Sequence, residues 1–206
     1  MSNKFMEKGF TIIEMVISIF ILTIAIVGVF TAFMMITILT ADAANQLTGT
    51  YLAQEGMEIV RNIRDTNWLK LNAGTTTGVT WVDGLNVGAC SNDVTGCEAD
   101  YTSTIMSGNS NQYLYLNSNG FYNYDDTTGT KTNFKRKITI EPVVDVDGSS
   151  SHILMVKVQV SWDQKATILN PTCLAGDYGD PTKKCSNGIT AEGTLYDWFK
   201  YSTPTP

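Results

Sequence analysis

An uncharged run near the amino terminus constrains this chain more than any other feature. No Asp, Glu, Lys, Arg or His occurs between Met15 and Ala41. At about 1.5 Å of rise per helical residue, a helix over this run exceeds the roughly 30 Å of a bilayer core. One carboxylate, Glu14, directly precedes the run. We therefore expect residues 10–40 to form a membrane-spanning helix with an acidic group at its edge.

Glu14 needs a cation from outside its own helix. An acidic side chain within a membrane segment costs on the order of 2.5–3.5 kcal/mol on insertion scales. The uncharged run offers no compensating cation. The leader before it carries Lys4 and Lys8, and basic residues stay on the cytoplasmic side, so the chain after the span is predicted to be exported.

The junction between leader and run resembles a known processing signal. Gly9-Phe10-Thr11-Ile12-Ile13-Glu14 is similar to the motif of type IV prepilins and of the pseudopilins of type II secretion. The resemblance implies that a prepilin peptidase removes residues 1–9, cutting between Gly9 and Phe10, and methylates the new amino terminus. It also implies that the Phe10 ammonium of one subunit pairs with Glu14 of a neighbour. Both groups are charged near neutral pH and attract strongly in a low dielectric.

This resemblance also implies partners and a location. The partners are the prepilin peptidase, other pilin or pseudopilin subunits and the inner-membrane assembly platform. The chain would be a single-pass protein of the bacterial cytoplasmic membrane with its head outside, and then part of a periplasmic or extracellular filament. Many major pilins carry a proline within this span, and helix unwinding is associated with it. No proline occurs in this span here, so the resemblance does not predict such unwinding for this chain.

The helix is expected to continue beyond the membrane through residues 41–68. Apolar or small residues recur there at helical spacing and form one face: Leu52, Ala53, Gly56, Ile59, Val60 and Ile63. Gly49 and Gly56 each weaken a helix by roughly 1 kcal/mol relative to Ala, and close packing would explain them. On the outer face, Arg61 stands at helical neighbour spacing from Glu58 and Asp65.

Residues 69–206 are expected to form a β-rich head. Two segments alternate as strands do. In one, Phe134, Arg136, Ile138 and Ile140 share a face, and in the other Val156, Val158, Val160 and Trp162 do. A hairpin is predicted across Asn119-Gly120, and further strands near residues 166–170 and 189–199. The predicted fold class is α+β and pilin-like, a long amino-terminal helix packed on an antiparallel sheet.

Four cysteines fall as two local pairs, Cys90 with Cys97 and Cys173 with Cys185. Disulfides persist in exported domains. Three pairings are possible, and we favour the two local ones because each closes a loop of about 8–13 residues, for which the chain-entropy estimate is roughly 2–3 kcal/mol. A zinc site is not favoured, because six residues separate the first two cysteines and eleven separate the other two. Paired zinc ligands usually stand closer together in the sequence. Reduced thiols are the remaining alternative.

No catalytic residue, cofactor or metal site is indicated by the sequence. The single histidine, His152, lies in a Ser-rich segment and is expected at the surface or in a hydrogen bond. Asp145 with Asp147, or Asp177 with Asp180, could place oxygens around calcium, but a full ligand set is not present and turn chemistry explains them. An enzyme is therefore not expected.

Nucleic acid is not expected as a partner. The formal net charge is −6, and an acidic balance does not favour a polyanion. The one basic cluster, Lys135-Arg136-Lys137, lies in a predicted strand, where alternation sends Arg136 to the face opposite the two lysines.

The expected function is structural. Segments of the head, Gly129–Arg136, Val160–Asp163 and Leu195–Trp198, resemble minor pilins related to the pilus modification group. We therefore expect a minor subunit of a type IV pilus or of a related secretion filament. The processes expected for such a filament are cell adhesion or secretion. The alternative is a membrane-anchored surface binding module that does not polymerise, and cleavage after Gly9 separates the two.

Overall fold

The computed structural model describes most of the chain, which divides into two units, Met1–Ala44 and Asn45–Pro206. The described residues are 9, 11–73, 78–91, 95–108, 111–143, 152–164, 172–178, 185 and 187–198. Several residues with expected roles lie outside them: 1–8, Phe10, Asp145, Asp147, Asp180 and the strand expected near 166–170.

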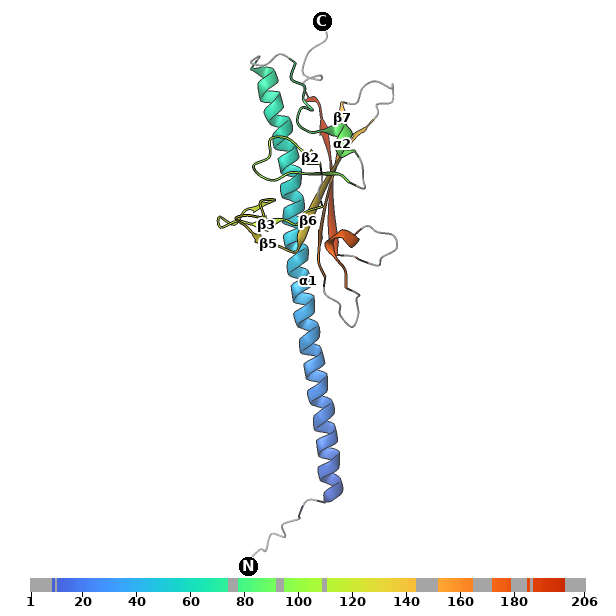
Figure 1. The fold of residues 1–206 in the computed structure, drawn as a ribbon. Helices are drawn as coiled ribbons and strands as arrows, with labels where there is room; N and C mark the ends of the chain where they lie inside the picture. Colours follow the sequence, from blue (N-terminus) through green and yellow to red (C-terminus); the bar gives the residue numbers. More distant parts are fainter. Residues whose placement is uncertain are drawn as a thin grey trace, which may run out of the picture. The chain divides into compact units, whose positions relative to one another are not determined.

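One helix, α1 (Ile12–Asn72), accounts for most of the amino-terminal third of the chain (Figure 1). The sequence predicts that this helix ends at Trp68, and the observed helix continues for four more residues. Lys70 lies in the last turn, where a cation interacts favourably with the negative end of the helix dipole. The helix and the sheet described below make the fold α+β and pilin-like, as predicted.

The head contains a five-stranded antiparallel sheet in the order β2-β1-β6-β7-β8. Its strands are β1 (Cys97–Glu98), β2 (Ser107–Gly108), β6 (Phe134–Val143), β7 (Ile153–Trp162) and β8 (Gly188–Tyr196). The strand expected at residues 189–199 is therefore β8, and it ends three residues earlier. Two short helical segments accompany the sheet, α2 (Val87–Cys90) and the 3₁₀ turn η1 (Ala175–Asp177).

A second sheet has three short strands in the order β4-β3-β5. They are β3 (Tyr115–Leu116), β4 (Tyr122–Asn123) and β5 (Thr130–Lys131). The predicted hairpin across Asn119-Gly120 is the β3–β4 pair. Gly120 takes a positive φ of 83°, and Asn119 does not.

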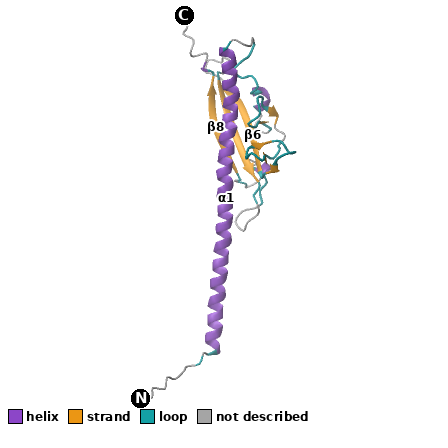
Figure 2. Ribbon diagram, turned by 90° about the vertical axis from the view of Figure 1, so that its left-hand side faces the viewer, coloured by secondary structure: helices purple, strands orange, loops and turns teal. Residues whose placement is uncertain are grey.

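The helix from Asn45 onward packs on the inner face of the five-stranded sheet (Figure 2). Every residue of the predicted apolar stripe is buried, and so are the alternate side chains of β6 and β7 that share the core. The two glycines mark the closest approach. A Cβ on Gly49 would lie 2.9 Å from the Trp162 ring, and one on Gly56 would lie 2.8 Å from Val158. Close packing therefore explains both glycines.

The outer face of α1 carries one of its two expected ion pairs. Arg61 pairs with Glu58, as the spacing predicts. Asp65 instead accepts a hydrogen bond from Arg64 Nε at 2.8 Å. Arg64 is held near Asp65 because its side chain is buried and its guanidinium lies 4.8 Å from the Trp198 ring centre. The prediction of an Arg61–Asp65 ion pair was therefore wrong. The packing of Arg64 places its guanidinium beside Asp65, and Asp65 pairs with Arg64 instead of Arg61.

Arg136 is a fully buried cation beneath α1. Its Nη1 donates to Leu52 O at 3.2 Å and lies 3.3 Å from Glu55 Oε2, and its Nη2 donates to Ala99 O at 2.7 Å. A buried charge is tolerated only when it is paired and hydrogen-bonded. Burial also raises the pKa of Tyr124 to about 12; its neutral hydroxyl donates to the Arg136 carbonyl.

We expect Arg136→Ala to lower the free energy of unfolding by about 3–5 kcal/mol, because it leaves an underpacked site and buried carbonyls without a donor. Arg61→Ala is the matched control. Its exposed pair should contribute under about 1 kcal/mol. Denaturant unfolding of the full-length protein in detergent, followed by tryptophan fluorescence, measures both. Equal losses would contradict the central role of Arg136.

Candidate functional site

The start of α1 is capped by residues of the processing motif itself. The helix begins at Ile12, and the Glu14 backbone N–H donates to Thr11 O at 3.1 Å and to Thr11 Oγ1 at 3.4 Å. Thr11 and Glu14 thus stand at the Ser/Thr-x-x-Glu spacing of a capping box. Glu14 also lies in the first turn, where a carboxylate favours the positive end of the helix dipole.

The capping role of Thr11 and Glu14 was not predicted from the sequence, although their Thr-x-x-Glu spacing is present in the motif. Gly9 is exposed and precedes the first helical turn. Phe10, the residue expected to carry the new amino terminus, lies outside the described residues.

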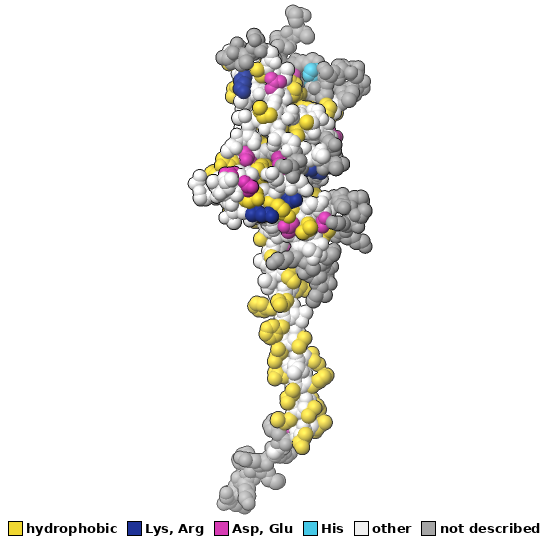
Figure 3. Space-filling view, viewed as in Figure 1, with side chains coloured by type: hydrophobic (Ala, Val, Ile, Leu, Met, Phe, Trp, Pro, Cys, Tyr) yellow, Lys and Arg dark blue, Asp and Glu magenta, His cyan; other side chains and the backbone are white. Residues whose placement is uncertain are grey.

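The first half of α1 exposes a continuous apolar surface (Figure 3). All its large hydrophobic side chains from Ile12 to Leu39 are exposed, for example Phe33 at 71%. By length and composition, α1 is the one helix in the described part of the chain that could cross a membrane. A surface of this kind needs an apolar environment, either lipid or other apolar helices.

Hydroxyl groups within this surface are satisfied by the helix itself. Each donates to a carbonyl three or four residues earlier at 2.7–2.9 Å, and the donors are Ser18, Thr23, Thr31, Thr37 and Thr40. In lipid, a polar group without a partner costs several kcal/mol. The polar residues of the run are therefore compatible with a hydrocarbon environment.

Residues 4–30 match the family model of the prokaryotic N-terminal methylation motif. The chain carries the type IV prepilin-like signal. No curated protein and no solved structure matches the chain. The motif points to a pilin-like or pseudopilin structural subunit rather than to an enzyme. Together with the apolar helix, it fits a protein anchored in the inner membrane, cut by prepilin peptidase and assembled with other pilins.

The four cysteines form two local bridges. Cys90 at the end of α2 joins Cys97 in β1, with their Cα atoms 5.1 Å apart. Cys173 joins Cys185, with Cα atoms 5.7 Å apart. Cys97 also pairs with Ile138 of β6. The first bridge therefore ties the loop that it closes to the five-stranded sheet.

The other residues singled out by the sequence do not converge on a reactive centre. His152 is partly buried, and its Nδ1 lies 3.5 Å from Asp197 Oδ2. Asp177 Oδ2 accepts the Leu174 backbone N–H at 2.9 Å, which is turn chemistry. Within the described residues, no three His, Cys, Asp or Glu side chains group as metal ligands.

Non-reducing peptide mapping of the exported protein should recover Cys90–Cys97 and Cys173–Cys185 linked peptides. Replacing Cys90 and Cys97 together by Ser should lower the free energy of unfolding by about 2–3 kcal/mol, the entropy estimate for a loop of this size. Cross-linked peptides between the two pairs, or four free thiols, would contradict this pairing.

Proposed function

We propose that this chain is a structural subunit, a minor one, of a type IV pilus or a related secretion filament, assembled through α1. The observation that carries the proposal is the methylation motif at residues 4–30, followed at once by a helix whose apolar side chains are exposed. A simple anchor needs the apolar helix but not the processing signal. The proposed partners are prepilin peptidase, other subunits and the inner-membrane assembly platform.

Glu14 is the proposed assembly residue. It lies in the first turn of α1, directly before the uncharged run. Its carboxylate can help cap its own helix, but a net charge in an apolar filament core still requires a cation. The methylated Phe10 ammonium of a neighbouring subunit would supply it. A tip subunit has no subunit ahead of it, so the pairing places this chain below the tip.

Processing is the first test of the proposal. The intact mass of the mature protein should show loss of residues 1–9 and one added methyl group on Phe10. Gly9→Leu should leave the leader attached, because the cleavage site no longer fits. Gly28→Leu is the control, since no heavy atom lies within 4 Å of a Cβ at Gly28, and it should be processed normally. A mature chain that starts at Met1 or Ser2 would refute the proposal.

Two replacements of Glu14 separate charge pairing from helix capping. Glu14→Gln keeps a hydrogen-bonding side chain and removes the charge, whereas Glu14→Val removes both. Each should leave insertion, cleavage and head stability intact. Recruitment into filaments should fall at least tenfold for both, because an unpaired buried ammonium costs about 3–5 kcal/mol.

Immunoblots of membrane and sheared-filament fractions from the native host measure this recruitment. If Glu14→Gln incorporates like the unmodified protein, charge pairing is unnecessary and the assembly role of Glu14 fails. Correct cleavage with no incorporation of the unmodified chain would instead favour the membrane-anchored binding module.

A further inference from the structure

Strand β8 forms one edge of the five-stranded sheet, and it is the longest sheet edge in the described part of the chain. It pairs with β7 on one side and with no described strand on the other (Figure 2). It has nine residues, whereas the opposite edge β2 and both edges of the three-stranded sheet have two each. Among these edges, only β8 is long enough to pair with a further strand over several residues.

The hydrogen-bonding direction of β8 follows from the residue pairs at its two ends. The Trp162 N–H donates to the Asn187 carbonyl at 3.1 Å. The Asp197 N–H donates to the His152 carbonyl at 2.9 Å. Both pairs continue the β7–β8 register, in which hydrogen-bonded and non-hydrogen-bonded pairs alternate. Odd-numbered residues of β8 therefore bond β7, and even-numbered residues point their N–H and C=O groups away from it.

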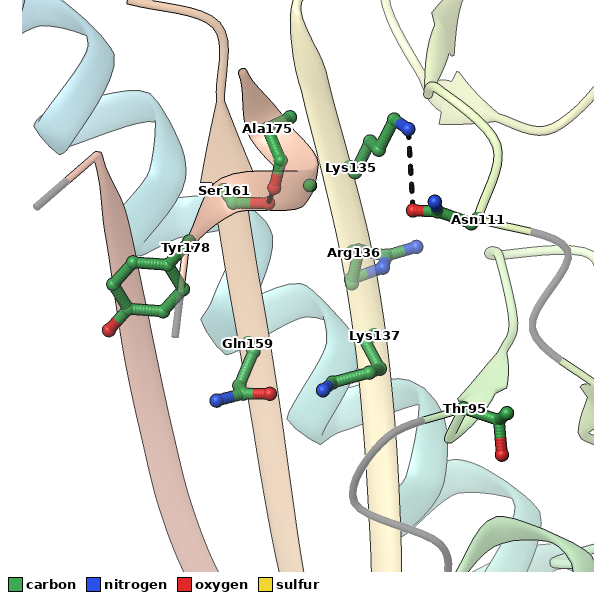
Figure 4. Close-up of a pocket in the computed structure, with 10 residues that line it drawn as sticks. Thr95, Asn111, Lys135, Arg136, Lys137, Gln159, Ser161, Ala175 and Tyr178 are labelled. Atoms are coloured by element: carbon green, nitrogen blue, oxygen red, sulfur yellow. Dashed lines mark hydrogen bonds between the residues drawn. The ribbon is translucent and has the colours of Figure 1, made fainter. Parts of the chain in front are cut away.

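We define the β8 edge as residues 190–196. The start of the strand is excluded because the Tyr178 ring lies over Gly188, beside a cavity of about 240 Å³ on the outer sheet face (Figure 4). In the described part of the chain, the outward backbone groups of this edge have no hydrogen-bond partner. They belong to Thr190, Glu192, Thr194 and Tyr196.

The β8 edge lacks the features that usually protect an edge strand. Natural edges are blunted by short strands, prolines, lysines or bulges. The nine residue pairs between β7 and β8 run without a bulge, and β8 contains neither proline nor lysine. The end of the strand is also anchored, because the ring centres of Trp198 and Trp68 of α1 lie 5.6 Å apart. An ordered edge lowers the cost of adding a strand.

The apolar core is open along this edge. Ile189 and Ala191 of β8 face the core and are only partly buried against it. Gly193, on the same face, has no side chain, and Met57 of α1 lies over it, since a Cβ there would stand 3.3 Å from Met57 Cε. Because residues 191 and 193 are small, larger apolar side chains on a neighbouring strand would extend the core.

We propose that the β8 edge binds an extended segment of another polypeptide, which adds an antiparallel strand to the sheet. The inward residues of this segment are large and apolar, because they pack beside Ala191 and Gly193. Its outward residues are polar, with a Lys or Arg beside Glu192, the one charged side chain of β8. This binding is additional to filament assembly through α1.

A second copy of the chain fits this edge less well. Its own β8 contains no basic residue to place beside Glu192. It also presents Ala191 and Gly193 on the inner face, where the edge needs larger apolar side chains. The chemistry of the edge therefore favours a segment of different sequence.

Fluorescence anisotropy of a labelled peptide with full-length protein in detergent tests the proposal, with protein-free micelles as background. The peptide has the nine-residue length of β8, alternates threonine with valine, and carries lysine in place of the central threonine. Directly opposite residues of an antiparallel pair share a sheet face, so the polar peptide residues are the ones that bond β8. N-methylation of the threonines should therefore weaken binding about tenfold or more. N-methylation of the valines should change the affinity less than about twofold, because their N–H groups point away from β8.

Two replacements of Thr194 separate the backbone from the side chain. Thr194→Pro removes an N–H that points away from β7, and proline is tolerated on edge strands, so circular dichroism should show a folded head. Peptide binding to this variant should fall about fivefold or more. Thr194→Val keeps the N–H and should change the affinity less than about twofold, because main-chain hydrogen bonds supply the affinity.

Glu192→Gln tests the charge preference. Replacing the peptide lysine by threonine should weaken binding to the unmodified protein about threefold at low ionic strength. The same peptide change should alter binding to Glu192→Gln less than about twofold, because the carboxylate is absent.

The proposal is overturned if the peptide does not bind, if both N-methylated peptides bind equally, or if Thr194→Val weakens binding as much as Thr194→Pro. Deletion of residues 199–206 that tightens peptide binding about tenfold would also overturn it, by assigning the edge to that segment. Loss of self-association in Thr194→Pro, measured by light scattering, would instead assign the edge to a second copy. None of these outcomes bears on cleavage after Gly9, so the assembly proposal is tested separately.

Discussion

The head depends on one buried cation. Arg136 joins three parts of the chain, because its guanidinium bonds the carbonyls of Leu52 in α1 and Ala99 after β1 while its own strand lies at the centre of the sheet. Glu55 supplies the countercharge at 3.3 Å. Since a charge in the core is stable only with all these partners, the arginine fixes where the helix crosses β6.

The glycine at residue 56 belongs to the same arrangement. A Cβ there would lie 3.0 Å from Arg136 Cδ and 2.8 Å from Val158, so the helix backbone approaches the sheet only because that side chain is missing. Glycine weakens an isolated helix by about 1 kcal/mol. Packing against the sheet offsets that cost, which makes the carboxyl-terminal half of α1 a helix stabilised by tertiary contacts.

The two faces of the main sheet serve different purposes. The inner face is apolar apart from Arg136 and lies under the helix. The outer face is polar, and residues of the loops closed by Cys90–Cys97 and Cys173–Cys185 line a cavity on it. In a small domain, crosslinks add stability that a single layer of core cannot supply. Here they also shape a concave surface on the sheet face opposite α1.

Local patterns in the sequence determined the processing signal, the membrane-length helix, the stripe from Leu52 to Ile63 and the alternation of β6 and β7, because each depends on spacing within one segment. Only the tertiary structure decided the contacts between distant segments. The partners of Arg136 are Glu55 and the carbonyls of Leu52 and Ala99, and residues of the two disulfide loops line one cavity. Such contacts depend on strand order and on how the helix crosses the sheet, and periodicity within a segment carries no information about either.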